Sequence, residues 1–269
     1  MSGFSAQWLA LREPYDRKAR SPAVLDALAR AFADHSSIGV VDLACGTGAT
    51  LRAISPRLPP RQDWRLVDND LGLLARAADL ARPPSLSVSA RAVDLARDLE
   101  LALDGPTDLI TTSALLDLVS RPWMDRLAIE AAARRLPVYA ALTYNGVAEL
   151  SPAEALDTGL IAALNAHQHT DKGFGPALGP DAGNAAVQCF ARVGYSIQQR
   201  RSDWILGPTD HEIQLVLLAG WAGATQELGD LTADEITAWL AQRRAHVTAG
   251  SSRMRIGHTD MFAAPIGIR

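Results

Sequence analysis

Apolar residues recur along this chain in two patterns. Short continuous apolar runs predict five strands, at residues 38–44, 64–68, 86–93, 107–113 and 137–144. Apolar residues spaced three and four apart predict helices around these strands, including 22–34, 71–81 and 120–135. Strands that alternate with helices at this spacing indicate βαβ units, and therefore a parallel sheet with helices on both faces. Such a sheet binds ligands at the carboxyl ends of its strands.

Three aspartates end the first three predicted strands. Asp42, Asp68 and Asp94 lie 26 residues apart, close to the length of one βαβ step, so we expect them side by side at one sheet edge. A carboxylate after the second strand accepts hydrogen bonds from both ribose hydroxyls in dinucleotide sites. Any one of these aspartates alone would be interpreted as a turn cap. Three in register, with a glycine turn after the first, indicate a nucleoside site.

The glycine turn after the first strand narrows the choice of nucleoside. Gly46 and Gly48 are present, but Leu51 occupies the third position, where a dinucleotide-binding turn has glycine. The Gly-Lys-Ser/Thr ending of a phosphate-binding P-loop is also missing. We therefore expect an adenosine ligand without a pyrophosphate.

These residues together resemble the class I S-adenosylmethionine-dependent methyltransferases of the small-molecule type. The segments that carry the resemblance are Asp42-Leu-Ala-Cys-Gly-Thr-Gly48, Asp68, Asp94-Leu95, TTSALLDLV at 111–119 and CFARVGYSIQQRR at 189–201. The resemblance implies an α/β fold: a Rossmann-like, seven-stranded, mostly parallel sheet with helices on both faces. Its last strand would be antiparallel, and residues 253–265 have the right alternation for that strand.

The resemblance also implies a site for S-adenosyl-L-methionine. The glycine turn would pass under the methionine part of the cofactor, Asp68 would hold the ribose, and Asp94 would accept from the adenine amine. An arginine of the N-terminal segment would pair with the cofactor carboxylate. The alternative is that these arginines only form a solvent-exposed charged segment. The implied cofactor residues are Asp42, Ala44, Cys45, Gly46, Gly48, Asp68, Asn69, Asp94, Leu95, Thr112, Ser113 and Arg20. Ala44 departs from the family, whose turn usually begins with glycine.

Three segments of the chain are least like the general family. We expect a single domain over 1–269, with a Rossmann-like core at 36–145, 181–202 and 252–265. Residues 1–35 would form an N-terminal cap segment, and insertions at 146–180 and 203–251 would form helical caps over the carboxyl edge of the sheet. The second insertion contains predicted helices at 211–226 and 232–247, the latter starting with a Thr-Ala-Asp-Glu capping box. Substrate choice is expected in these caps.

Methyl transfer is an in-line displacement and has no obligatory catalytic signature, but a protonated acceptor requires a general base. The candidate catalytic residues are Asp117 after the fourth strand, Tyr144 at the end of the fifth and His167 in the first insertion. Each has a structural alternative: a turn carboxylate, an ordinary loop start and a hydrogen-bonded histidine. His167 and His169 lack a third ligand nearby, so no metal site is expected.

Composition excludes several other classes. The chain has 269 residues, 48% of them hydrophobic, with a net charge of −4 and two cysteines, which is typical of a cytoplasmic globular protein. It offers no basic block for nucleic acid and no apolar run long enough for a signal peptide or a membrane span. The predicted function is methyl transfer to a small-molecule acceptor. The alternatives are a protein or RNA methyltransferase, a nucleotide-dependent oxidoreductase and a catalytically silent binding protein. Neither the acceptor nor the oligomeric state is indicated.

Overall fold

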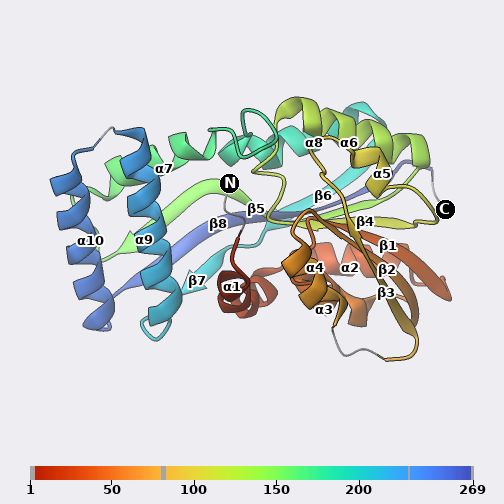
Figure 1. Cartoon of the computed structure of the whole chain (residues 1–269), viewed down its shortest axis with the longest axis horizontal. Coiled ribbons are helices and arrows are strands. Elements are labelled where there is room, and N and C mark those ends of the chain that lie inside the picture. The colour runs from red at the N-terminus through yellow and green to blue at the C-terminus, as the bar shows by residue number, and fades with distance from the viewer. Residues whose placement is uncertain (1–3, 80–82, 230, 268–269) are drawn as a thin grey trace.

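A computed structural model describes residues 4–79, 83–229 and 231–267. The two terminal ends of the predicted domain, and the last residues of the predicted helix 71–81, therefore lie outside the described residues. The described strands form one sheet in the order β3-β2-β1-β4-β5-β8-β6, with β7 also paired to β8 (Figure 1). Their bounds are β1 Ser37–Leu43, β2 Arg61–Asp68, β3 Leu86–Ala92, β4 Leu109–Ser113, β5 Val138–Ser151, β6 Tyr195–Arg201, β7 Trp204–Leu206 and β8 Arg253–Pro265.

This sheet confirms the predicted fold and adds one short strand to it. Strands β1 to β5 pair in parallel, and β8 runs antiparallel between β5 and β6, as expected for the last strand. We predicted seven strands, which is the number in the order given above, and the described residues contain an eighth strand outside that order. The extra strand, β7, follows β6 after a break at Ser202 and Asp203 and pairs with an earlier stretch of β8. Because β8 is 13 residues long, it has room for both partners.

Helices cover both faces of the sheet. Their bounds are α1 Ala6–Ala19, α2 Pro22–Ala31, α3 Ala49–Ile54, α4 Leu71–Ala78, α5 Leu99–Ala102, α6 Arg121–Arg134, α7 Asp157–Gln168, α8 Ala182–Arg192, α9 His211–Leu228 and α10 Ala233–Thr248. Helices α2, α3 and α4 bury Leu28, Ile54 and Leu74 in one core, and α5, α6 and α8 contribute Leu99, Leu127 and Phe190 to the other. Within the described residues, no helix is long and apolar enough to cross a membrane.

Strand β5 is longer than predicted. It was expected to end at Tyr144, but it continues to Ser151 beside the first half of β8, so the predicted boundary at residue 145 falls inside the strand. The pairing shifts between Tyr144 and Ala148, which marks a bulge. Gly257 of β8 faces this bulge so closely that a β-carbon there would lie 2.2 Å from Oδ1 of Asn145. The bulge therefore depends on a glycine across the ladder.

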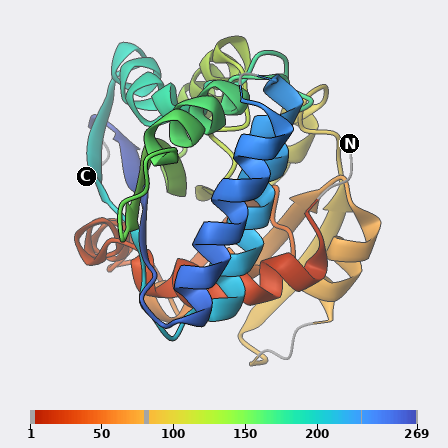
Figure 2. The same cartoon turned by 90° about the vertical axis from the view of Figure 1, so that its left-hand side faces the viewer.

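The extended ends of β5 and β8 carry a third core. It includes Tyr144, Leu164, Trp204, Trp221 and Trp239, drawn from β5, α7, β7, α9 and α10. Figures 1 and 2 show α9 and α10 side by side at the end of the molecule formed by these strands. The predicted capping box of α10 is present, because Thr232 accepts from the Glu235 N–H and the Glu235 carboxylate accepts from the Thr232 N–H.

Candidate cofactor and acceptor site

The glycine turn joins β1 to α3 through left-handed backbone conformations. Ala44 has φ 52°, Gly46 has φ 54° and Gly48, the N-cap of α3, has φ 81°. A β-carbon makes this conformation cost about 1–2 kcal/mol, so Ala44 carries a strain that glycine would not. The Cys45 N–H donates to the Val67 carbonyl at 2.9 Å and anchors the turn to β2.

Asp68 connects this turn to the end of β2. One carboxylate oxygen accepts from the Gly46 N–H at 2.9 Å, and the other accepts from the Asp70 N–H at 3.0 Å. Asp94 lies one strand further along the edge, where it is exposed and accepts from the Ala96 N–H at 3.0 Å. Asp68 and Asp94 therefore lie at successive strand ends, as the sequence predicts.

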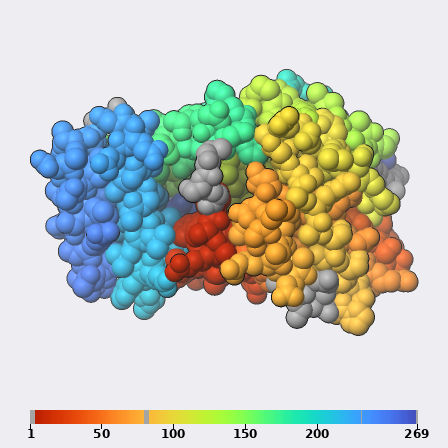
Figure 3. Space-filling view, in the orientation of Figure 1, coloured from red at the N-terminus to blue at the C-terminus, as the bar shows by residue number. Residues whose placement is uncertain are grey.

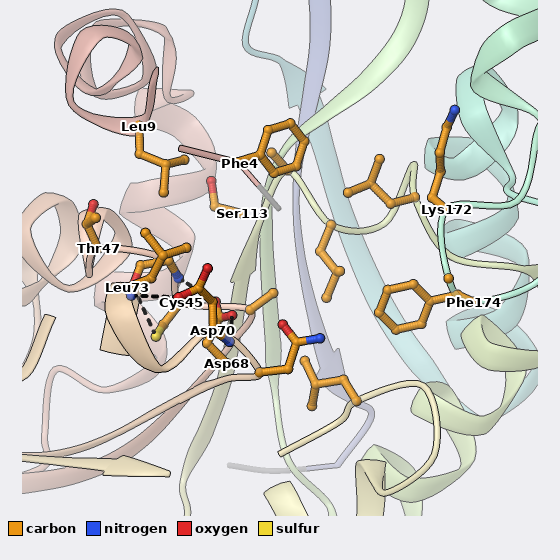
Figure 4. Close-up of a pocket in the computed structure, with 18 of the residues that line it drawn as sticks. Phe4, Leu9, Cys45, Thr47, Asp68, Asp70, Leu73, Ser113, Lys172 and Phe174 are labelled. Atoms are coloured by element: carbon orange, nitrogen blue, oxygen red, sulfur yellow. Dashed lines mark hydrogen bonds between the residues drawn. The ribbon is translucent and has the colours of Figure 1, made fainter. Parts of the chain in front are cut away.

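A cavity of about 1180 Å³ opens above these strand ends. Figure 3 shows the face of the molecule where α1, α4 and the α7 segment meet, and Figure 4 shows the cavity itself, with Cys45, Asp68 and Asp70 opposite Lys172 and Phe174. Eight predicted cofactor residues line it: Ala44, Cys45, Gly46, Asp68, Asn69, Asp94, Leu95 and Ser113. Of the predicted catalytic residues, His167 also lines it.

Four predicted cofactor residues lie behind the cavity wall. Gly48 is buried at the start of α3, and the Thr112 hydroxyl donates to the Leu43 carbonyl at 3.0 Å. Arg20 is 4% exposed and donates to the Tyr139 hydroxyl at 3.0 Å and to Ser113 Oγ at 3.3 Å. Arg20 thus reaches the cavity through Ser113.

Asp42, the fourth of these residues, is completely buried. It accepts from Thr111 Oγ1 at 2.8 Å, and Oδ2 has no hydrogen-bond partner among the described residues. Burial raises the pKa of Asp42 to about 7, against the opposing effects of the Thr111 hydrogen bond and the Arg20 charge. An unpaired buried acceptor is unfavourable, so Oδ2 is suited to a small donor such as water, although Asp42 itself does not line the cavity.

Asp117 and Tyr144 lie outside the cavity lining. Asp117 is buried, its Oδ1 has no hydrogen-bond partner among the described residues, and burial raises its pKa to about 6. The Arg12 charge opposes this rise. The Tyr144 hydroxyl donates to Asn165 Oδ1 at 2.8 Å, and burial raises the tyrosine's pKa. Tyr144 lies within β5 and not in a loop, and its ring centroid is 6.2 Å from that of His258.

His167 joins the two insertions at the cavity wall. Its Nε2 lies 2.9 Å from Glu227 Oε2 of α9, and its Nδ1 lies 3.3 Å from Lys172 Nζ. Because a lysine ammonium only donates, Nδ1 accepts and Nε2 carries the proton toward Glu227. Both ring nitrogens are therefore engaged, and the histidine bridges residues that are 60 positions apart. His169 lies apart from this bridge, 3.3 Å from the Ala177 carbonyl. No group of three or more His, Cys, Asp or Glu side chains suited to a metal ion occurs in the described part of the chain.

The sequence indicated a role for an arginine of the N-terminal segment but not which residues of that segment line the cavity, among them Leu9, Arg12 and Asp16. Arg12 of α1 holds Asp16 with two nitrogens, at 2.9 and 3.2 Å, and its guanidinium lies 5.0 Å from the Trp204 ring centroid. The Trp204 indole also donates to Asp16 at 3.1 Å. The only available signal was the spacing of Leu9, Arg12 and Asp16, which puts them on one face of a helix.

Comparison with known proteins agrees with this geometry. Residues 40–137 match the family described as methyltransferase domain. A search of curated proteins gave no significant match. Among solved structures, a cyclopropane-fatty-acyl-phospholipid synthase-like protein from Lactobacillus casei shares the fold, with a TM-score of 0.52, 16% identity and coverage of 97% of this chain and 94% of that one.

Two further structures have lower scores. The cyclopropane synthase MmaA2 from Mycobacterium tuberculosis has a TM-score of 0.49 and 12% identity, with 90% of this chain and 83% of that chain covered. A SAM-dependent methyltransferase from Thiobacillus denitrificans, solved with S-adenosyl-L-homocysteine, has a TM-score of 0.43 and 14% identity, with 97% and 99% covered.

The family match, together with the glycine turn, the acids at successive strand ends and the sheet order, identifies residues 40–137 as part of a class I S-adenosylmethionine-dependent methyltransferase domain. S-adenosylmethionine is the cofactor expected for this family.

Proposed function

We propose that this protein transfers a methyl group from S-adenosyl-L-methionine to a small-molecule acceptor. The observation that carries the proposal is that the glycine turn, Asp68 and Asp94 line one cavity of about 1180 Å³. Ligand pockets usually measure roughly 300–1,000 Å³, so this cavity has room for a nucleoside cofactor and a small acceptor together. The net charge of −4 and the absence of a basic block in the sequence argue against a nucleic-acid acceptor.

The cofactor residues keep the roles that the family resemblance implies. Asp68 would hold the ribose diol, Asp94 and the Leu95 N–H would receive the adenine, and Asn69 would lie beside the ring. Gly46 supports a close approach of the methionine part, because it has no side chain and its φ of 54° is a conformation that glycine adopts without strain. Asp42 would fix the turn or meet the cofactor's amino group through water, and Arg20, which donates to Ser113 in the cavity lining, would pair with the cofactor carboxylate.

S-adenosyl-L-methionine supplies an activated methyl group, so the chain has to hold the acceptor in line and exclude water. Leu115, Leu118 and Phe174 give the acceptor side of the cavity an apolar surface, with Arg12 and Lys172 as its cations. Asp117 is our candidate general base, because a carboxylate with a pKa of about 6 is ionised at neutral pH and still accepts a proton. Because it lies outside the cavity lining, it would act on the acceptor through a bridging water. Tyr144 would support it from β5. His167 would shape the cavity, because its two ring nitrogens hold Glu227 and Lys172 in place at the cavity wall.

We further propose that substrate choice resides in the caps. The two insertions meet at the contact of His167 with Glu227, and residues from both line the cavity beside α1 of the N-terminal segment. The rest of the chain would then be a general methyltransferase core, within one domain. We also propose that the enzyme works in the cytoplasm, from its composition.

The test of cofactor binding is calorimetry with S-adenosylhomocysteine on an Asp68→Ala variant. Loss of two charge-assisted hydrogen bonds to the ribose predicts affinity weaker by about a hundredfold. Asp63→Ala is the matched control, because Asp63 lies on the same strand and contacts Ser87 outside the cavity. Equal affinities in wild type and Asp68→Ala would refute the cofactor site.

The acceptor is sought by a methyl-transfer screen of a metabolite library, with release of S-adenosylhomocysteine as the readout. A small-molecule hit that Asp68→Ala fails to methylate supports the proposal. Transfer to protein or RNA fractions alone would replace it.

A further inference from the structure

Helix α6 holds the loop that follows β3 from behind. The indole N–H of Trp123 donates to the Leu95 carbonyl at 2.7 Å, and Trp123 is 4% exposed. Trp123 also packs edge-on against Phe174, with ring centroids 5.5 Å apart. The indole is therefore fixed on one side by the loop after β3 and on the other by the first insertion.

A second α6 side chain extends this hold along the loop. Arg126 donates to the Ala96 carbonyl at 3.3 Å and to the Arg97 carbonyl at 2.7 Å, and an ion pair with Glu100 fixes its guanidinium. Three successive carbonyls, of residues 95, 96 and 97, are thus bonded to two side chains of one helix.

The peptide group between Leu95 and Ala96 passes this constraint on to Asp94. Its carbonyl accepts from Trp123, and its N–H donates to Asp94 Oδ1 at 3.0 Å. Because a peptide group is planar, fixing its carbonyl also fixes the direction of its N–H. Trp123 therefore orients the Asp94 carboxylate through a single peptide unit.

The same loop presents a donor without a partner. Leu95 lines the cavity and is 5% exposed, and its backbone N–H makes no hydrogen bond to any described residue. Buried backbone N–H groups are almost always paired. A free N–H beside a carboxylate matches the acceptor and donor edge of a 6-aminopurine.

From this chain of contacts we propose that Trp123 is a positioning residue for the adenine of the cofactor. It never touches the ring, but it sets the direction of Asp94 and of the free Leu95 N–H. The inference rests on the proposed function, and it names a residue outside the cavity lining that controls recognition of the exocyclic amine.

The experiment compares two probes by calorimetry: S-adenosylhomocysteine and its analogue with hypoxanthine in place of adenine. Asp94 accepts from an amine and not from a carbonyl, so we expect wild type to prefer the adenine probe. Trp123→Phe keeps an aromatic ring and removes the indole N–H. We expect it to bind the adenine probe about fivefold to tenfold more weakly, to bind the hypoxanthine probe nearly as well as wild type does, and so to lose discrimination.

Trp64→Phe is the matched control. Trp64 is equally buried, and its indole N–H donates to Gln62 Oε1 at 2.8 Å in the other core. This variant should keep the wild-type ratio of affinities even where its stability falls. If Trp123→Phe does not fold, replacing Trp123 by benzothienylalanine, which has sulfur at the indole nitrogen position, repeats the test without loss of volume.

The outcomes separate the two proposals. A parallel loss of affinity for both probes, or an unchanged ratio, would overturn the role of Trp123 and leave the cofactor site intact. A wild-type protein that binds both probes equally would overturn recognition through Asp94, and with it the positioning role. A wild-type protein that binds neither probe would refute the proposed function itself.

Discussion

Two nitrogens of Arg52 in α3 donate hydrogen bonds to the carboxylate of Glu13 in α1, at 2.7 and 2.5 Å. The third nitrogen of Arg52 donates to the Thr47 carbonyl at 2.6 Å. One guanidinium therefore ties the N-terminal helix to the glycine turn. On the inner side of the same helix, Leu9 lies over Gly46, where a β-carbon would come within 3.1 Å of its methyl group. Helix α1 is thus part of the proposed cofactor site and not only a cover for it.

Arg52→Met should weaken binding of S-adenosylhomocysteine about fivefold, because it releases both α1 and the Thr47 carbonyl. Calorimetry measures this directly. Glu13 also contacts Arg17, whose side chain is mostly exposed, and exposed helix pairs contribute little. Arg17→Met is therefore the control and should bind as wild type does. Similar losses in both variants would argue against a specific link through Arg52.

Cofactor affinity should rise with pH up to about 7. Burial raises the pKa of Asp42 to about 7, so without ligand the carboxyl is mostly protonated below that value. The ammonium of S-adenosylhomocysteine favours the ionised form, and binding then releases a proton. The dissociation constant should fall between pH 5.5 and 7 and level off above pH 7, while Asp42→Asn should flatten this dependence. Calorimetry in buffers of different ionisation enthalpy counts the protons released, and a count of zero at pH 6 would contradict the prediction.

Acid should destabilise the fold through His258. This residue is buried beside Arg12, and burial lowers its pKa to about 3, against the attraction of Asp203. The unfolded chain binds a proton near pH 6.5 and the native state does not, so stability is full above about pH 6.5 and falls as the pH drops from there toward 3. At pH 5 the loss is about 2 kcal/mol.

Urea unfolding at pH 7.5 and pH 5 measures this loss, and His258→Phe serves as the comparison. The variant should lose less free energy of unfolding between the two pH values than wild type does. An equal loss in both proteins would assign the acid sensitivity to other groups.

Gly257→Ala should destabilise the protein at the bulge between β5 and β8, next to the third core. Its new methyl group would lie 2.2 Å from Asn145 Oδ1 and 2.7 Å from Val147 Cβ, and overpacking of this kind costs about 1–3 kcal/mol. Gly220→Ala is the control, because the space around Gly220 on α9 is open, and alanine in a helix should stabilise by about 0.5–1 kcal/mol. Thermal unfolding gives both values, and changes of the same sign would refute the account of the bulge.

The parallel half of the sheet could be predicted from the sequence because each of its first three strands ends near its own acid. Helix α1 could not be predicted from the sequence, because it contains Pro14 and its inner face carries the charged residues Arg12 and Asp16. These two side chains are buried only because they pair with each other and with Trp204. A local pattern cannot indicate a partner that lies 188 positions away.

The end of β5 was mispredicted for a related reason. Asn145-Gly146 is a turn signal in most contexts, but here these residues form a bulge that Gly257 accommodates from the neighbouring strand. In the site, the positions of Asp68 and Asp94 followed from the strand order. The strand order did not predict which side chains point into the cavity, because this depends on how each strand end twists. Asp42 and Thr112, which lie behind the cavity wall, are examples. The contact between His167 and Glu227 depends on two insertions that meet only in the folded chain.

Strand β8 is the last strand along the described chain, yet it lies between β5 and β6, which are made much earlier. While the ribosome is still synthesising residues 253–265, the nascent chain therefore contains three strands, β5, β6 and β7, that still lack β8 as a partner. The β1 to β4 half has all of its own partners by then and is free to assemble first. Closure of the sheet, and with it the burial of the third core, has to wait for translation of β8. Premature termination before Arg253 would leave long open edges that are prone to aggregation.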